Sequence, residues 1–381
     1  MTGGGSGGHI VPLLSLAHEL KQQAPDCEIV YIGHKGDNFD SLNLPKHDFD
    51  FLAFINGGKF RRYHNEGLLA HLADVKTIML NIRDFFRVIG AIGSAYKILN
   101  RTHTQVLFAK GGFVSVPVGI AARLKGIPIV THDSDVVGGL ANRIVGRWAV
   151  IRATGMPTKF YKKGKAKLEY VGIPLDENIQ YVTPTNLEEY KRQLKLPDNS
   201  QVVLVAGGGL GSQSVNELVI NSAPNLLQSN LALHIIHITG QQHLDAVEKS
   251  YSKSLEPAAR KRVNCIGFAP KFYNYSGAAD LIISRAGATA IAEFALQGKA
   301  CIIIPSPFLT GGHQLKNAEE LAREDAAVVL EENSSPDELI GLVNQLLTND
   351  HRRWQLGDNL HKLAKPGAAK KLAAIILSQV R

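Results

Sequence analysis

A chain of 381 residues, 45% apolar and 20% charged, is typical of a globular protein of about two domains. Its three cysteines, Cys27, Cys265 and Cys301, fit neither a disulfide framework nor a zinc site, and no apolar run reaches the roughly 18 residues of a membrane span. The net charge of +8 favours an anionic substrate or an anionic membrane surface. Nucleic acid is not expected, because RNP-type aromatic motifs, zinc-finger spacing and long Lys/Arg blocks are missing.

The N-terminal half opens on a glycine-rich segment, Thr2–His9. An amphipathic helix follows, with apolar residues at helical spacing from Ile10 to Leu20 and Pro12 in its first turn. A turn of this kind presents backbone N–H groups and the positive end of a helix dipole to an anion. His9 lies at the rim, where an imidazole exchanges protons near neutral pH. The alternative is a tight surface turn with an incidental histidine.

Short apolar strands alternate with helical patterns along this half, which predicts a parallel sheet with helices on both faces. The predicted strands are 28–32, 49–54, 106–108, 127–131, 148–153 and 168–171. A glycine-rich loop normally follows a buried strand, yet only Met1 precedes Thr2. Either upstream residues are missing or the sheet lacks its first strand, and we favour the former.

The second half repeats this organisation. Residues 173–190 lose the pattern and predict a linker, after which the glycine-rich turn Gly207–Gly211 leads into a predicted helix over 212–227. The predicted strands are 201–205, 233–239, 262–266, 281–284, 301–305 and, at the far edge, 326–329. We therefore expect two doubly wound α/β domains, residues 1–175 and 176–363, facing each other across a cleft, with a helix of about 364–381 packing back on the first.

Two further segments carry candidate binding groups. Ser284–Glu293 joins a strand end to a glycine turn and a helix start, which suits a diphosphate, and Glu293 is placed to accept ribose hydroxyls. The alternative is a glutamate that only stabilises the helix dipole. His313 and Gln314 open another helix after a strand, and either face the same cleft or form a plain N-terminal cap.

Five motifs together resemble the MurG family, the transferases that add N-acetylglucosamine to lipid I in peptidoglycan synthesis. They are GGGSGGHIVP from Gly3, GGFVSVPVGIAA from Gly111, THDSDVVGGLANR from Thr131, SRAGATAIAE from Ser284 and HQLKNA from His313. They span almost the whole chain in the expected order. The resemblance implies a GT-B fold of two Rossmann-like domains and inversion at the anomeric carbon of the sugar. It also implies UDP-GlcNAc as donor, an undecaprenyl-linked acceptor and no cofactor.

The resemblance also implies roles for single residues. His9 matches the family's general base, with Asp133 as the alternative, Glu293 matches a ribose contact, and Gln314 matches a glutamine that reads the sugar. The other implied donor contacts are Ser6, Gly7, Gly8, Asp135, Gly209, Ala269, Ala288, Thr289, Ala290, Ile291 and Ala292. The motifs hold no DxD-type carboxylate pair, so we expect helix dipoles and backbone N–H groups, not a metal, to stabilise the leaving diphosphate.

The chain departs from the family pattern at several of these positions. Asp135 stands where the family usually carries asparagine, and Asp176 stands where it carries arginine. In the second glycine-rich turn, Gly209 and Gln213 replace a serine and an arginine. These departures concern contacts to the phosphate and sugar of the donor.

The helical stretch 68–96 carries a broad apolar stripe beside basic residues. Its part Ile78–Ile89 predicts an interfacial helix on an anionic leaflet, whereas 68–75 is expected to pack on its own sheet. The cations and aromatic residues of this part are Arg83, Arg87, Phe85 and Phe86. A peripheral position at the cytoplasmic face of the cell membrane follows.

Two other functions are compatible with the same sequence. A UDP-GlcNAc 2-epimerase would share the fold, although it needs further cleft carboxylates and no lipid surface. A non-catalytic UDP-sugar-binding relative would account for the lost arginines and serine.

Overall fold

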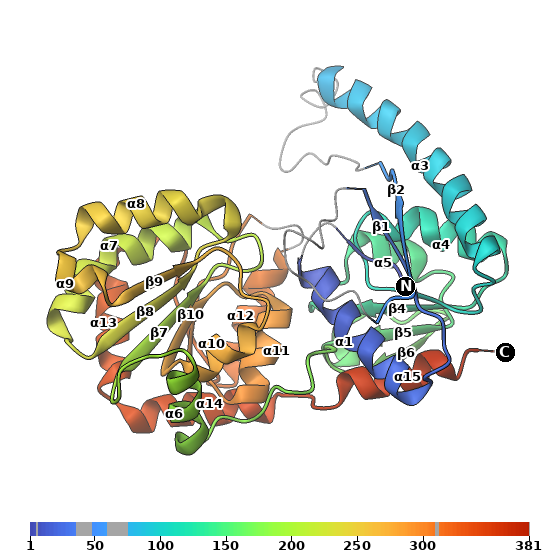
Figure 1. Cartoon of the computed structure of the whole chain (residues 1–381). Helices are drawn as coiled ribbons and strands as arrows, with labels where there is room; N and C mark the ends of the chain where they lie inside the picture. The colour runs from blue at the N-terminus through green and yellow to red at the C-terminus, as the bar shows by residue number, and fades with distance from the viewer. Residues whose placement is uncertain (5–6, 36–47, 59–74, 309–311, 381) are drawn as a thin grey trace. The chain divides into compact units, whose positions relative to one another are not determined.

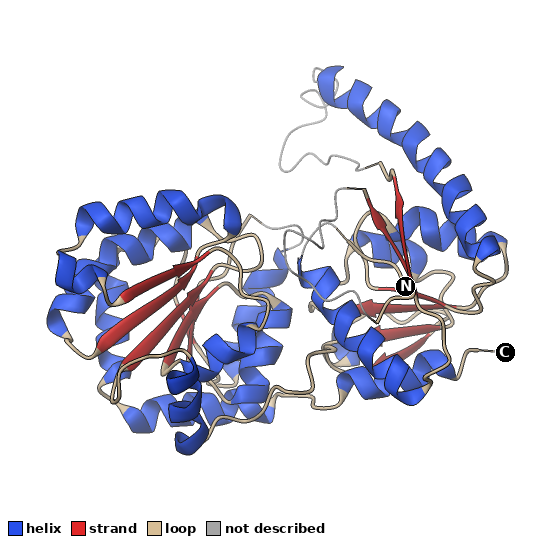
Figure 2. Ribbon diagram, in the orientation of Figure 1, coloured by secondary structure: helices blue, strands red, loops and turns tan. Residues whose placement is uncertain are grey.

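The structure is a computed structural model that describes residues 1–4, 7–35, 48–58, 75–308 and 312–380, with the backbone alone for 7–9 and 75–78. The chain divides into two compact units. The N-terminal unit is Met1–Pro174 together with Gly367–Arg381, and the C-terminal unit is Leu175–Pro366. Each unit has a parallel sheet with helices on both faces (Figures 1 and 2), as the alternating sequence pattern predicts.

The sheet of the N-terminal unit has two groups of strands. They are the pair β1 (Val30–His34) and β2 (Phe51–Ile55), and the run β3 (Leu107–Ala109), β4 (Ile129–Asp133), β5 (Ile151–Thr154) and β6 (Lys167–Tyr170). Thr2 joins the two groups, because it forms parallel bridges to Ile32 of β1 and Ala109 of β3. Its amide donates to Phe108 O at 2.9 Å, and its carbonyl accepts from Lys110 N at 2.9 Å. The sheet therefore does not lack a strand position before the glycine-rich loop, since the residues around Thr2 fill it.

Helices cover both faces of this sheet. They are α1 (Gly7–Gln23), α3 (Val75–Arg101), α4 (Ser115–Leu124), α5 (Leu140–Val145) and, from the chain end, α15 (Ala368–Leu377). The last of these packs on α1, where Gln23 Nε2 donates to Lys370 O at 3.0 Å. The helix α1 begins at Gly7, so the placement of Pro12 in the first turn is wrong and His9 lies in that turn instead.

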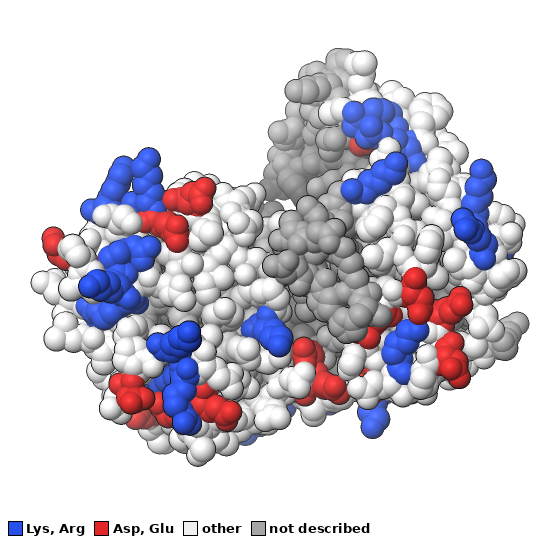
Figure 3. All heavy atoms as spheres, in the orientation of Figure 1, with Lys and Arg blue, Asp and Glu red and all other residues white. Residues whose placement is uncertain are grey.

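The buried apolar residues among the described side chains of α3 lie in its second half. Ala91, Ala95 and Leu99 are buried against β2, β3 and α4. The preceding turns expose large apolar side chains, and Figure 3 shows basic side chains over this helix beside uncharged surface. Residues 68–74, expected to pack on the sheet, lie outside the described residues.

The C-terminal unit has a six-stranded parallel sheet in the order β12-β11-β10-β7-β8-β9. Its strands are β7 (Gln201–Ala206), β8 (Leu233–Ile238), β9 (Val263–Ile266), β10 (Leu281–Ser284), β11 (Cys301–Ile303) and β12 (Val328–Val329). The chain winds outward from β7 to one side and from β10 to the other. The point between β7 and β10 is thus the topological switch point, where ligands of such sheets bind beyond the carboxyl ends of the strands.

Two apolar layers enclose this sheet. One lies under α7 (Gln213–Ser229), α8 (Leu244–Ser254) and α13 (Pro336–Leu347), and the other under α10 (Phe272–Ala278), α11 (Ala288–Gln297) and α12 (His313–Arg323). The remaining helices of the unit are α6 (Pro184–Gln193), α9 (Pro257–Arg260) and α14 (Asp350–Lys362).

The predicted linker 173–190 is too long, because α6 already begins at Pro184. Thr183 and Asn186 form a capping box at its start: the Thr183 amide donates to Asn186 Oδ1 at 2.6 Å, and the Asn186 amide donates to Thr183 Oγ1 at 3.4 Å. Pro184 occupies the first helical position, where its missing N–H costs nothing. The loss of pattern therefore ends at Pro184, which marks a helix start.

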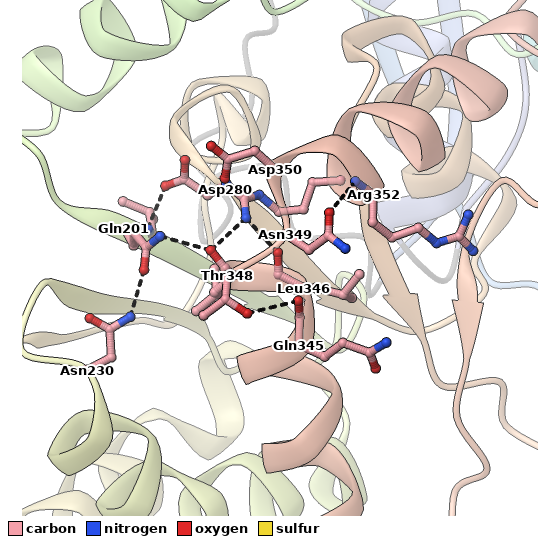
Figure 4. A network of polar contacts seen from close by, with 12 residues as sticks. Gln201, Asn230, Asp280, Gln345, Leu346, Thr348, Asn349, Asp350 and Arg352 are labelled. Atoms are coloured by element: carbon pink, nitrogen blue, oxygen red, sulfur yellow. Dashed lines mark hydrogen bonds and ion pairs between the residues drawn. The ribbon is translucent and has the colours of Figure 1, made fainter.

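The amino-terminal edge of the same sheet is closed by a polar network (Figure 4). Gln201, the first residue of β7, donates to Leu347 O at 3.1 Å and accepts from Asn230 Nδ2 at 2.7 Å. Asp280, just before β10, accepts from Val202 N at 2.7 Å. The bond from Gln201 joins the end of α13 to the amino-terminal edge of the sheet. Ligands of such sheets bind at the opposite, carboxyl edge.

Candidate active site

The first glycine-rich segment follows Thr2 at the carboxyl edge of the N-terminal sheet. Gly3 O accepts from the Tyr31 hydroxyl at 2.5 Å. Gly112 packs so close that a Cβ there would lie 2.5 Å from Gly4 O, and its φ of +79° suits only glycine. Gly7, Gly8 and His9, the last residues of this segment, begin α1, and the His9 side chain and Ser6 lie outside the described structure.

Asp133 ends β4 at the same edge and is almost fully buried. Its Oδ1 accepts from Asn142 Nδ2 at 2.9 Å and from the Gly139 amide at 3.2 Å. Burial raises the pKa of this carboxyl, while the bond from Asn142 and the positive charge of Lys110 act in the opposite direction. These two bonds hold the side chain in a fixed orientation, and no partner of its second oxygen is found among the described residues.

In the part of the chain that the structure describes, that oxygen is one of four buried polar atoms on β4 and α5 without a hydrogen-bond partner. The others are Thr131 Oγ1, His132 Nδ1 and Asn142 Oδ1. Buried polar groups are normally paired, and exceptions cluster where a ligand or water completes the site. The end of β4 therefore carries several buried polar groups beside the Asp133 carboxyl.

Lys110 is a member of this cluster that the sequence did not single out. It follows β3 directly, and its ammonium donates to Ser134 Oγ. Burial lowers its pKa to about 8, against the opposing effect of the Asp135 and Asp133 charges. Asn142, also missed, ties the cluster together by donating to His132 O at 2.8 Å.

In the C-terminal unit, Glu293 lies on the second turn of α11, below the helix N-terminus formed by Ala288, Thr289 and Ala290. Its side chain is 8% exposed, and its Oε1 accepts from Ser276 Oγ at 3.4 Å. Burial raises its pKa to about 8, with Asp176 contributing in the same direction. The backbone N–H groups of the first turn have no intrahelical acceptor, so they are available to an anion.

Asp135 follows β4 in the N-terminal unit, whereas the other implied donor contacts outside the first glycine-rich segment surround the C-terminal sheet. Ile291 and Ala292 belong to α11, and Ile291 and Ala269 are buried in the apolar layer beneath it. Gln314, in the first turn of α12, accepts from the Ser306 amide at 3.0 Å and so holds the loop after β11. Gly209 is exposed in the loop after β7.

A buried arginine connects the two loops at the switch point. Arg285, directly after β10, donates to Ser212 Oγ at 3.0 Å and to Ser214 Oγ at 2.6 Å, at the end of the second glycine-rich turn and the start of α7. It also donates to Ile304 O at 3.1 Å and pairs with Glu332. Local sequence patterns do not predict these contacts of Arg285, because the partners come from three separate segments.

The described residues were also searched for metal-binding groups and for membrane-spanning helices. No group of three His, Cys, Asp or Glu side chains among them is placed to hold a metal ion. None of the described helices is both long and apolar enough to cross a bilayer.

Comparison with known proteins identifies the family. The glycosyltransferase family 28 N-terminal domain matches residues 1–154, and the C-terminal domain of the same family matches residues 202–372. A Halothermothrix orenii protein is 32% identical over 380 residues, covering 98% of this chain and 97% of its own length. It is named UDP-N-acetylglucosamine--N-acetylmuramyl-(pentapeptide) pyrophosphoryl-undecaprenol N-acetylglucosamine transferase. The chain belongs to the MurG family of glycosyltransferases.

Solved structures share the fold. The crystal structure of Acinetobacter baumannii MurG superposes with a TM-score of 0.68 at 22% identity, covering 99% of this chain and 98% of that one. A Listeria monocytogenes protein assigned as a UDP-N-acetylglucosamine 2-epimerase gives a TM-score of 0.65 at 12% identity, covering 99% and 95%. The GT-B fold is therefore confirmed. Because an epimerase has it too, the fold alone does not distinguish the two activities.

Proposed function

We propose that this chain transfers N-acetylglucosamine from UDP-GlcNAc to the muramyl 4-hydroxyl of an undecaprenyl-diphosphate-linked acceptor, converting lipid I to lipid II in peptidoglycan synthesis. The observation that carries the proposal is full-length similarity to a protein named for this transfer. The geometry is compatible with it, since each unit has a glycine-rich segment and a helix N-terminus at the carboxyl edge of its sheet.

The reaction is a single displacement with inversion. The acceptor oxygen forms a bond to the anomeric carbon as the bond from that carbon to the diphosphate oxygen breaks, and the electron pair leaves with UDP. The hydroxyl proton passes to a base. The negative charge that develops on UDP is stabilised by backbone N–H groups and helix dipoles, for which the N-terminus of α11 is our candidate.

In the C-terminal unit we assign the donor to the switch point between β7 and β10. Glu293 would accept the ribose hydroxyls, the α11 N-terminus would hold the diphosphate, and the backbone around Ala269 would contact uracil. Arg285 holds the two flanking loops together from below. Gly209 has no side chain where the family carries a serine, so only its backbone is available for contacts to the donor.

We assign the acceptor hydroxyl and the general base that takes its proton to the N-terminal unit. His9, at the start of α1, is the first candidate for the base, and Asp133 is the alternative. Support for Asp133 comes from its fixed Oδ1 and unpartnered Oδ2. A positioned base is needed because a sugar hydroxyl is a poor nucleophile at neutral pH.

The first half of α3 is our candidate for membrane contact at the cytoplasmic face. The exposed fractions of three of its side chains are 53% for Phe85, 66% for Phe86 and 66% for Met79, so this face of the helix does not pack on the sheet. Arg83 and Arg87 flank these rings. Exposed aromatic residues beside cations favour binding at the interface of an anionic leaflet.

One incubation with UDP-GlcNAc and a lipid I analogue tests the proposal. Formation of the disaccharide product with release of UDP supports it. Conversion of UDP-GlcNAc to UDP-ManNAc without acceptor would show an epimerase instead, and binding without turnover would show a non-catalytic relative.

A further inference from the structure

The carboxyl edge of the C-terminal sheet carries a polar network that crosses the ends of neighbouring strands. Arg285 follows β10 directly, and Glu332 lies three residues after β12, the outermost strand. Their side chains form an ion pair and are only 8% and 17% exposed. The pair passes over the end of β11, where Arg285 Nη1 donates to Ile304 O at 3.1 Å. A buried arginine and a carboxylate from the edge of the sheet are therefore joined across β11.

The network ends on the first turn of α7. Arg285 Nε donates to Ser212 Oγ at 3.0 Å, and Arg285 Nη2 donates to Ser214 Oγ at 2.6 Å. Ser214 in turn donates to Glu332 Oε1 at 2.7 Å, so the guanidinium, the hydroxyl and the carboxylate form a closed ring of contacts. Ser212 is the N-cap residue of α7, yet its side chain makes no capping bond to the helix. A serine there normally accepts from an amide of the first turn, and here the contact with Arg285 takes the place of that cap.

Fixing Ser212 also fixes the second glycine-rich turn, Gly207–Gly211, because the turn folds back tightly on this residue. A Cβ at Gly207 would lie 2.5 Å from Ser212 N, and a Cβ at Gly211 would lie 2.0 Å from Thr239 O. Gly211 also has a φ of +79°, which favours glycine. The conformation of the turn therefore depends on its two ends, β7 and the first turn of α7, being held in place.

This turn has few polar side chains of its own for binding a ligand. Gly209 and Gln213 stand where the family carries a serine and an arginine, and Gln213 Nε2 donates to Glu217 Oε1 at 2.8 Å on the exposed side of α7. Contacts from the turn to a donor are therefore left to its backbone. Backbone contacts require the turn to keep one conformation, and such a conformation is maintained by the residues that support it.

We propose that Glu332 is a positioning residue of donor binding: through Arg285 and Ser214 it holds the turn Gly207–Gly211 in the conformation that presents its backbone to the sugar nucleotide. The inference rests on the proposed function for the identity of the donor and for its place at the switch point. It adds a residue from the edge of the sheet that acts through Arg285 and not by contact with the donor.

Donor affinity of E332A tests the proposal. The calorimetric dissociation constant for UDP-GlcNAc should rise about tenfold, within the range of coupling between residues of one polar network, and KM for the donor should change more than kcat. S214A removes the hydroxyl between Arg285 and Glu332, so it should weaken binding as well. Because both residues act through one network, E332A/S214A should bind about as weakly as E332A alone.

A second buried ion pair of the same sheet provides the matched control. Lys191 and Asp280 lie 3.1 Å apart at the amino-terminal edge, with side chains 5% and 10% exposed. D280A also breaks a buried pair and destabilises the same unit, but it should leave the dissociation constant for UDP-GlcNAc at the wild-type value, because the pair lies at the other end of the strands. Urea denaturation of each variant verifies that it is folded under the conditions of the assay.

Three results would overturn the proposal: wild-type affinity in a folded E332A, an equal loss in E332A and D280A, or additive losses in E332A/S214A. If E332A does not fold, E332Q takes its place, because a glutamine keeps the length of the side chain and an oxygen that accepts from Ser214, and removes only the charge. Wild-type affinity in E332Q then contradicts the inference. A wild type that does not bind UDP-GlcNAc contradicts the proposed function, whereas one that binds and transfers with no response to these substitutions contradicts only the role of Glu332.

Discussion

Arg285 and Glu332, 47 residues apart in the sequence, form an ion pair at the carboxyl edge of the C-terminal sheet. The same carboxylate oxygen accepts from Ser214 Oγ at 2.7 Å. The pair thereby fixes the loop after β10 against the start of α7, and both of these segments flank the proposed donor site.

Replacing Glu332 by alanine should lower the free energy of unfolding by about 3 kcal/mol, because removing one member of a buried pair leaves the other charge uncompensated. Urea denaturation measures the change. Glu331→Ala, at an exposed neighbouring position, is the matched control and should be close to wild type. Equal effects of the two substitutions would show that the Arg285 pair contributes no net stability.

Glu293 should make stability depend on pH. Its folded pKa of about 8 lies above the ordinary value of 4.5, so the folded state binds more protons between these values. The contribution of this group to stability is full below about pH 4.5 and is lost as the pH rises through about 8. The difference in free energy of unfolding between E293Q and wild type, followed from pH 5 to 9, isolates it from other titrating groups. A difference that does not change with pH would contradict the raised pKa.

The same residue should contribute to donor affinity. Glu293→Ala removes the acceptor of two ribose hydroxyls, and above the Glu293 pKa of about 8, where the carboxylate is charged, such hydrogen bonds are worth roughly 1.5–3 kcal/mol. Titration calorimetry with UDP-GlcNAc should show a loss of this size, whereas Glu248→Ala, exposed on α8, should leave affinity unchanged. If E293A binds as tightly as wild type, Glu293 does not belong to the donor site.

Membrane binding should depend on the exposed rings of α3. Replacing Phe85 and Phe86 by serine should weaken binding to anionic vesicles and leave the fold and UDP affinity intact, since both rings are more than half exposed. Arg83 and Arg87 are unsuitable for charge reversal, because both pair with Asp84, which is 2% exposed. Leu231→Ser, 80% exposed on the C-terminal unit, is the control in a vesicle co-sedimentation assay. Loss of the folded state in F85S/F86S would show that the rings are part of the core.

The sequence was most informative where local patterns decide structure. Alternating apolar strands and helices predicted the parallel sheets, with strand ends displaced by up to three residues, and β12 at the edge as expected. It was least informative at prolines, which occur both in loops and in the first turn of helices. The pattern predicts a linker that includes Pro184, whereas Pro184 begins α6. It also predicts Pro12 in the first turn of α1, whereas that helix begins at Gly7.

In the candidate site, too, local patterns identify some residues, whereas long-range contacts cannot be predicted. Glu293 follows a strand end, a glycine turn and a helix start, and Asp133 follows the predicted strand 127–131, so local patterns point to both. Lys110 and Arg285 were not identifiable in this way, because their partners are brought together only by the folded sheets: Ser134 is 24 residues from Lys110, and Glu332 is 47 residues from Arg285. Single-chain periodicity carries no signal for such long-range polar pairs.

The identity of the base is the sharpest remaining test of the mechanism. His9→Ala should lower kcat by about 10²–10⁴-fold, the usual contribution of a positioned base, while UDP-GlcNAc affinity stays near wild type. Asp133→Asn keeps the shape of the side chain and removes its capacity to accept a proton, so it separates the competing assignment. If D133N abolishes turnover and H9A barely changes it, the roles are reversed and His9 orients the acceptor.

The pH profile adds a second criterion, because the raised pKa of Asp133 would move the acidic limb of kcat to higher pH if this carboxyl were the base. If both variants turn over normally, neither residue is the base and the proposed mechanism fails, whereas the family assignment stands on its own evidence.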